Sequence, residues 1–132
     1  MSIIIDNYRI NWALRYIREA DADLSIAEGE PINAVSKTFA LRAMRKSQIA
    51  IYYSLGVPER LASLVSQSLD DRRRANDTTM HILVQMERLI QNANRLVERI
   101  DKMALLEEAL FLLDIASKIV DLVIDESNEQ PA

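Results

Sequence analysis

The stretch whose residue types could best carry out chemistry is RRRANDTTMH, residues 72–81. It contains three consecutive arginines and the only histidine of the chain. Histidine can transfer protons near neutral pH because its unperturbed pKa lies close to neutrality. Arg74 could stabilise the charge that develops on a phosphorane, so Arg74 with His81 could cleave RNA through its 2'-hydroxyl without a metal ion. Asp77, four residues before His81, could orient the imidazole. These residues form the first candidate site.

A helix that continues through this stretch would return to nearly the same face every seven residues. Such steps align four basic residues: Arg74, His81, Arg88 and Arg95. A second row beside them contains Thr78, Gln85, Asn92 and Arg99, and neither row contains a carboxylate. Guanidinium groups bind phosphate bidentately, so the rows could follow a nucleic-acid backbone, with Arg88 and Arg95 as contacts. The same face could equally be solvated or pair with acids of another helix or subunit.

The composition limits which functions are available. The chain has 132 residues, a formal net charge of −4 and no cysteine. An acidic total argues against nucleic-acid binding through bulk positive charge, although a local basic face remains compatible with it. The Glu-x-x-His pairs of di-iron bundles are absent, and Asp77 with His81 would give only two metal ligands. We therefore expect no metal site and no cofactor, in a cytoplasmic protein without a membrane segment.

Helical periodicity dominates the chain. Apolar residues recur at three- and four-residue spacing, and only two glycines and three prolines interrupt them. The pattern predicts helices at about 6–28, 31–55, 58–69, 71–100 and 102–125. We therefore predict an all-α, up-and-down bundle of four to five helices that forms one domain over residues 1–125, with a flexible tail over 126–132.

Two of these helices have distinctive faces. The second has a stripe of small residues, which would let another helix approach closely and predicts a central position. Its members are Ala40, Ala43, Ser47, Ala50 and Ser54. The last helix has two full apolar seams, so it either lies inside the bundle or also covers a partner subunit. We expect some of each, and hence a homodimer through apolar helix faces.

The first predicted helix contains YIREADADLSIAE, residues 16–28, and the second contains FALRAMRKSQIAIYYSLGVP, residues 39–58. These two helices resemble the first two helices of the HEPN (higher eukaryotes and prokaryotes nucleotide-binding) superfamily. The residues that carry the resemblance are Ala20, Asp23, Leu24, Ala27, Ala40, Ala43, Lys46, Leu55 and Gly56. The resemblance covers roughly residues 10–70. It implies a bundle of four or five helices, commonly a homodimer, that acts as a metal-independent ribonuclease or as a non-catalytic binding module.

The resemblance also implies roles for the candidate site. Active members have an arginine followed after about four to six residues by a histidine, as Arg74 and His81 are here with six residues between them. Ala75 stands where Asn, Asp or His is usual, and Asn76 comes one position later. On this basis Arg74 would stabilise phosphate, His81 would transfer a proton, and Asn76 or Asp77 would assist.

Two functions therefore remain open from the sequence. In the first, a HEPN-like bundle binds RNA or a nucleotide and cleaves RNA, with Arg88 as a substrate contact. In the second, the chain is a non-catalytic interaction or regulatory protein that forms a dimer or a complex with another chain. The doubly apolar last helix and the acidic net charge favour the second function.

Overall fold

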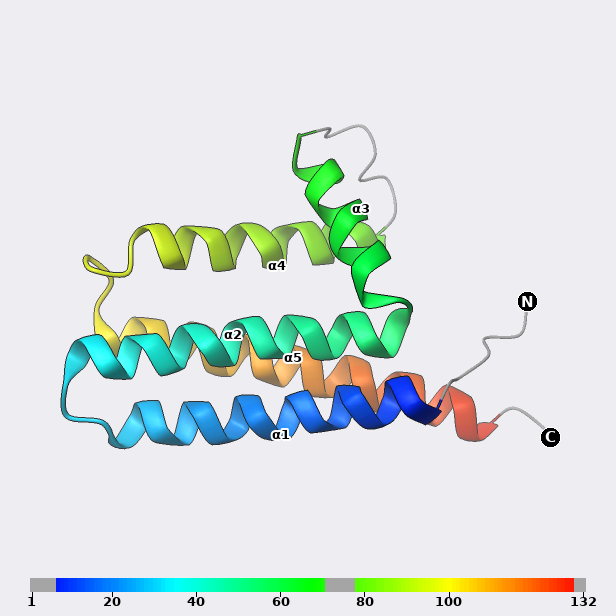
Figure 1. Cartoon of the computed structure of the whole chain (residues 1–132), viewed down its shortest axis with the longest axis horizontal. Helices are drawn as coiled ribbons and strands as arrows, with labels where there is room; N and C mark the ends of the chain where they lie inside the picture. Colours follow the sequence, from blue (N-terminus) through cyan, green and yellow to red (C-terminus); the bar gives the residue numbers. More distant parts are fainter. Residues whose placement is uncertain (1–6, 71–77, 130–132) are drawn as a thin grey trace.

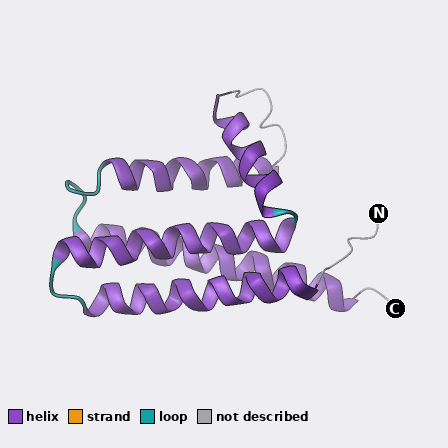
Figure 2. Ribbon diagram, in the orientation of Figure 1, coloured by secondary structure: helices purple, strands orange, loops and turns teal. Residues whose placement is uncertain are grey.

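The computed structural model describes residues 7–70 and 78–129 and consists of helices joined by short connections. The helices are α1 (Asn7–Gly29), α2 (Asn33–Leu55), α3 (Pro58–Asp70), α4 (Thr78–Arg95) and α5 (Lys102–Glu129). The described residues contain no strand (Figure 2). Four long helices run side by side, and the short α3 leads from the end of α2 across the start of α4 (Figure 1). This confirms the predicted all-α bundle.

α1 and α2 form an antiparallel hairpin with a shared apolar seam. Ala13, Ala20, Leu24 and Ala27 of α1 are buried, as the three- and four-residue spacing predicts. The helix ends at Gly29, one residue beyond the prediction, and the Ser36 hydroxyl donates to the Ala27 carbonyl at 2.6 Å. That bond satisfies a carbonyl of the last turn, which has no partner within its own helix.

α2 lies at the centre of the bundle, since it contacts each of the other four helices. Its small-residue stripe is fully or almost fully buried, and this confirms the central position that the stripe predicts. The hydroxyls within the stripe are satisfied locally: Ser47 donates to the Ala43 carbonyl at 2.8 Å and Ser54 to the Ile51 carbonyl at 2.8 Å. Small side chains therefore allow close helix approach without unpaired polar groups.

Asp23 and Lys46, two residues of the HEPN resemblance, form an ion pair between α1 and α2. Lys46 Nζ lies 2.8 Å from Asp23 Oδ2, and the Asp23 side chain is only 10% exposed. A carboxylate this well buried requires a partner because desolvation penalises its charged form. In this fold the pair links α1 to α2.

The prediction for the fourth helix, 71–100, is wrong at its C-terminal end. Residues 71–77 lie outside the described part of the chain, and α4 ends at Arg95, after which residues 96–99 form a turn. The turn is closed by the bond from the Arg99 amide to the Leu96 carbonyl at 2.8 Å, and Lys37 Nζ binds the Val97 carbonyl at 3.0 Å. The Val97 carbonyl therefore accepts a hydrogen bond from a lysine of α2, in place of the bond within the helix that the periodicity implies.

The last helix begins as predicted and ends later than predicted. The Leu105 amide bonds to the Asp101 carbonyl at 3.0 Å, and α5 starts at Lys102, as the predicted range 102–125 has it. The predicted end at residue 125 is wrong, because α5 continues to Glu129 and takes in part of the expected tail, 126–132. The sequence contains no helix breaker here before Pro131, which disfavours helix only in the residues next to it.

Candidate functional site

The residues of the predicted Arg74 and His81 site fall partly outside the described structure. Arg74, Asn76 and Asp77 lie in the segment 71–77, which the structure does not describe. His81 lies in the first turns of α4 and is exposed. It borders a mainly apolar hollow of about 190 Å³ between α4 and α5, whose other lining residues are Ile82, Gln85, Met86, Leu89, Phe111, Leu112 and Ile115. His81 therefore faces apolar side chains from α4 and α5.

The two predicted nucleic-acid contacts on α4 have different surroundings. Arg88 is half-buried, and its Nη2 donates to the Leu69 carbonyl at 3.3 Å. A cation at the C-terminal end of α3 is favourable because the free carbonyls there carry partial negative charge. Arg95 is exposed and donates to Asn92 Oδ1 at 3.2 Å. Arg95 thus remains open to a ligand, whereas Arg88 already ties α4 to α3.

A partly buried polar network between α2 and α4 is the principal feature that the sequence did not predict. Arg45 and Gln48 of α2 both bind the carboxylate of Glu87 on α4, Arg45 through Nη1 at 2.7 Å and Gln48 through Nε2 at 2.7 Å. Arg45 Nη1 also donates to Gln48 Oε1 at 2.6 Å, and Gln91 Nε2 donates to Glu87 Oε2 at 3.0 Å. Gln48 is almost completely buried and the Arg45 side chain is 42% exposed, so this network reaches from the core to the surface.

The network fixes the protonation states of its members. Burial acts to raise the pKa of Glu87, but the hydrogen bonds from Gln48 and Arg45 outweigh it and lower the pKa below its ordinary value. Burial, with a smaller contribution from the Glu87 charge, raises the pKa of Tyr52 to about 12. Tyr52 therefore stays a neutral hydroxyl, which accepts a hydrogen bond from Gln48 Nε2 at 3.0 Å.

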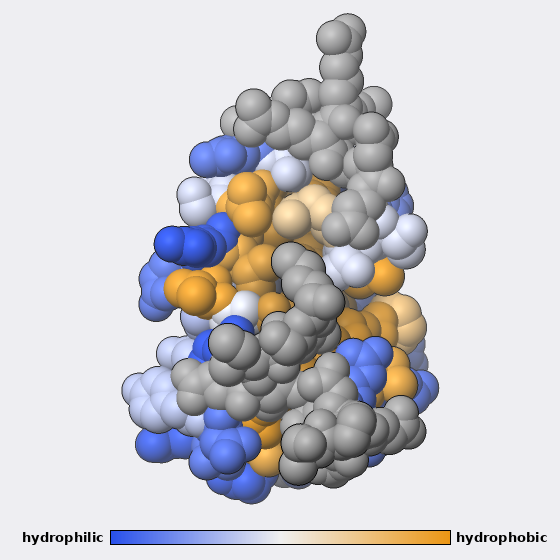
Figure 3. Space-filling model, turned by 90° about the vertical axis from the view of Figure 1, so that its right-hand side faces the viewer, coloured by the Kyte–Doolittle hydropathy of each residue, from blue (hydrophilic) through white to orange (hydrophobic). Residues whose placement is uncertain are grey.

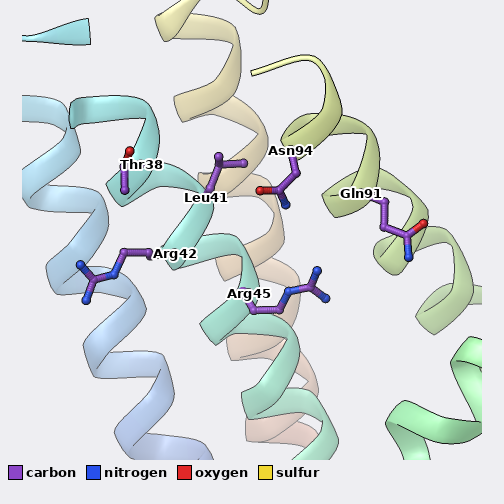
Figure 4. Close-up of a pocket in the computed structure, with 6 residues that line it drawn as sticks. All are labelled: Thr38, Leu41, Arg42, Arg45, Gln91 and Asn94. Atoms are coloured by element: carbon purple, nitrogen blue, oxygen red, sulfur yellow. The ribbon is translucent and has the colours of Figure 1, made fainter. Parts of the chain in front are cut away.

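A hollow of about 630 Å³ opens on one side of this network, and we call it the α2–α4 hollow. Its lining residues are Thr38, Leu41, Arg42, Arg45, Gln91 and Asn94. The four α2 residues recur at spacings of three and four, which places them on one side of the helix. Arg45 and Asn94 extend into the space between the two helices, whereas the Arg42 side chain is directed away from α4 (Figure 4). The Arg42 guanidinium lies 5.2 Å from the Phe39 ring centroid.

A second hollow, of about 350 Å³, opens on the other side of the network, and we call it the tyrosine hollow. It is lined by Tyr16, Arg45, Gln48, Ile49, Tyr52, Tyr53, Pro58, Glu59, Ala62 and Glu87. Arg45 lines both hollows, so they adjoin at this residue. Both hollows are shallow and open to solvent.

The sequence contains a weak signal for this network. Gln48 interrupts the apolar spacing of α2 between Met44 and Ile51, both of which are fully buried. A polar side chain at a core position implies a hydrogen-bonding partner inside the protein. The identity of that partner, Glu87, depends on how α4 packs against α2, and the periodicity of either helix alone does not specify it.

The described residues contain no group of three or more side chains suited to holding a metal ion. Over the same described part, no helix has the length and apolar character that crossing a membrane would require. Comparisons of the chain with protein-family models, with curated proteins and with solved structures gave no match. The function must therefore be argued from the residues and their geometry.

Proposed function

We propose that this protein binds RNA or a nucleotide, as the HEPN resemblance implies, and that the phosphate lies in the α2–α4 hollow. The observation that carries the proposal is the chemistry of the lining: the Arg45 guanidinium, two amides and a hydroxyl, with Arg42 at the margin and no carboxylate among the six lining residues. Guanidinium groups bind phosphate bidentately, and amides and hydroxyls add hydrogen bonds to phosphate oxygens. Such a site suits a polyanion even in a protein whose net charge is −4.

Arg45 has donors to spare for this role. Both of its hydrogen bonds within the described structure leave from Nη1, one to Gln48 and one to Glu87. A guanidinium has five N–H donors in a planar fork, so Nε and Nη2 remain for a phosphate. The Glu87 carboxylate holds the fork in place and thereby reduces the side-chain entropy that binding would otherwise cost.

The test is the affinity of the purified protein for a fluorescently labelled, unstructured oligoribonucleotide. We expect the double variant Arg42→Ala, Arg45→Ala to bind about tenfold or more weakly, since it lacks two phosphate contacts. Arg18→Ala is the matched control, because Arg18 is an exposed α1 arginine that lines neither hollow. Equal affinities for the double variant and the wild type would refute a phosphate site in the α2–α4 hollow.

Cleavage of RNA by Arg74 and His81 forms the catalytic part of the same proposal. His81 would transfer the proton and Arg74 would stabilise the phosphorane, with Asn76 or Asp77 as the polar auxiliary. We expect purified protein to cleave RNA in the presence of a chelator, and His81→Ala and Arg74→Ala to abolish cleavage with unchanged helical content. If both variants retain activity, the catalytic assignment is wrong. The binding proposal is tested separately by the affinity measurement.

Exposed apolar side chains on α5 favour the second candidate, an interaction protein that forms a dimer. Met103, Leu110, Phe111 and Leu122 are 61%, 53%, 60% and 63% exposed. They share the outward side of the helix with polar residues such as Glu107 and the ion-paired Asp114 and Lys118. Large exposed apolar groups beside charges are common at protein interfaces. The mass of the protein in solution shows whether these α5 side chains form a dimer interface.

A further inference from the structure

Four aromatic side chains form a cluster where α1 begins and α2 ends, and we call it the aromatic platform. Tyr8, Trp12 and Tyr16 follow one another at four-residue steps along α1, and Tyr53 joins them from α2. The Tyr53 ring is nearly parallel to its neighbours, with centroids 6.1 Å from Trp12 at 21° and 5.6 Å from Tyr16 at 19°. Tyr8 meets Trp12 edge to face, with centroids 6.2 Å apart.

The platform lies at the surface. Tyr8 is 65% exposed, and Trp12, Tyr16 and Tyr53 are partly exposed. Figure 3 looks onto the end of the bundle at which α1 begins and α2 ends, and both hydrophobic and hydrophilic residues are visible there. Arg15 places its guanidinium 4.9 Å from the Trp12 ring centroid. An array of partly exposed aromatic rings with an arginine beside it offers both stacking surface and positive charge.

The platform continues directly into the proposed phosphate site. Tyr16 and Tyr53 belong to the platform and also line the tyrosine hollow, whose Arg45 in turn lines the α2–α4 hollow. Along α2, Thr38 and Tyr53 are 15 positions apart, which corresponds to about 22 Å at the rise of an α-helix. A single nucleotide is shorter than this span, so the surface as a whole suits several linked nucleotides.

We propose that the ligand is a single-stranded oligonucleotide whose bases stack on the aromatic platform while its phosphates run past Arg45 into the α2–α4 hollow. This inference rests on the proposed function and narrows it to one substrate class. Paired bases are already stacked within a duplex and do not offer their faces to side chains, whereas unpaired bases do. The platform would therefore select single strands over duplexes.

The only tryptophan of the chain, Trp12, belongs to the platform, so its fluorescence reports directly on base stacking. We expect a single-stranded oligoribonucleotide to quench this fluorescence with saturation, and adenosine monophosphate or a duplex of the same sequence to bind about tenfold or more weakly. With a labelled oligonucleotide, we expect Trp12→Leu to weaken binding about tenfold or more and Trp12→Phe to preserve most of it. Phe111→Leu is the control, since it removes an exposed aromatic ring from α5.

The outcomes separate this inference from the function on which it rests. If Trp12→Leu binds with wild-type affinity while binding still depends on Arg42 and Arg45, base stacking on the aromatic platform is refuted. The proposed phosphate site is then unaffected. Equal affinity for single strand and duplex would also refute base stacking on the platform. If the wild-type protein binds no oligonucleotide at all, the proposed function fails together with this inference. Circular dichroism of each variant shows whether the helices are intact, and Tyr8→Leu, at the most exposed ring, repeats the test with little risk to folding.

Discussion

At the residue scale, Glu87 links the electrostatics of the candidate site to the stability of the fold. Three donors converge on its carboxylate from Arg45, Gln48 and Gln91. Hydrogen bonds to a charged acceptor are stronger than those between neutral groups. A buried donor that loses its partner destabilises the protein by the free energy of its own desolvation. Glu87 therefore stabilises the packing of α4 on α2 and also orients the guanidinium that we assign to phosphate binding.

We predict that Glu87→Gln lowers the free energy of unfolding at neutral pH by about 1–3 kcal/mol, because the new amide turns donors toward Arg45 and Gln48. The pKa of Glu87 is lower in the folded protein than its ordinary value of 4.5. Its stabilising contribution is thus fully present above that ordinary value and is lost as pH falls through the folded pKa. The difference between wild type and variant should therefore shrink below about pH 4.5.

Urea unfolding followed by circular dichroism at a series of pH values measures this difference. Glu107→Gln, at an exposed position on α5, is the matched control and should change stability by less than about 0.5 kcal/mol. A difference between wild type and Glu87→Gln that stays constant from pH 7 to pH 3 would show that the carboxylate charge is not the source of the stabilisation.

At the scale of the elements, the small-residue stripe of α2 determines how closely the other helices approach. Ala43 is fully buried at the centre of this stripe. We predict that Ala43→Leu destabilises the protein by about 1–3 kcal/mol or more, since the added methylenes must displace a packed neighbour. Ala34→Leu, at an exposed position in the first turn of α2, should have little effect on the thermal midpoint. Equal midpoints for the two variants would mean that the stripe is not a close helix contact.

The sequence predicts the helices well because their boundaries are marked locally. Gly29, Gly56 and Pro58 end or begin helices within a residue or two of the predicted positions. The end of α4 at Arg95 could not be predicted, because it coincides with a bond from Lys37, some sixty residues away in the chain, to the Val97 carbonyl. The sequence did not predict the candidate site for the same reason. Gln48 and Glu87 are separated by 39 residues and meet only through tertiary packing.

At the scale of the whole molecule, the exposed side chains of α5 raise the question of self-association. We predict a homodimer, with twice the chain mass of 15.1 kDa in sedimentation equilibrium at micromolar concentration. The double variant Leu110→Lys, Phe111→Lys should be a monomer, because it places two charges on the outward apolar side chains. Leu64→Lys, on the exposed side of α3, should leave the mass unchanged. A wild-type mass of one chain would exclude this dimer.

The central claim, that the α2–α4 hollow binds the phosphates of a nucleic acid, is tested most directly by the salt dependence of binding. For single strands, log K falls linearly with log salt concentration, with a slope of about −0.7 for each phosphate neutralised. We predict that Arg42→Ala with Arg45→Ala makes the slope for a single-stranded oligoribonucleotide shallower by about 1.4, while Arg18→Ala leaves it unchanged. A double variant with the wild-type slope would contradict the claim, because its arginines would then not contact phosphate.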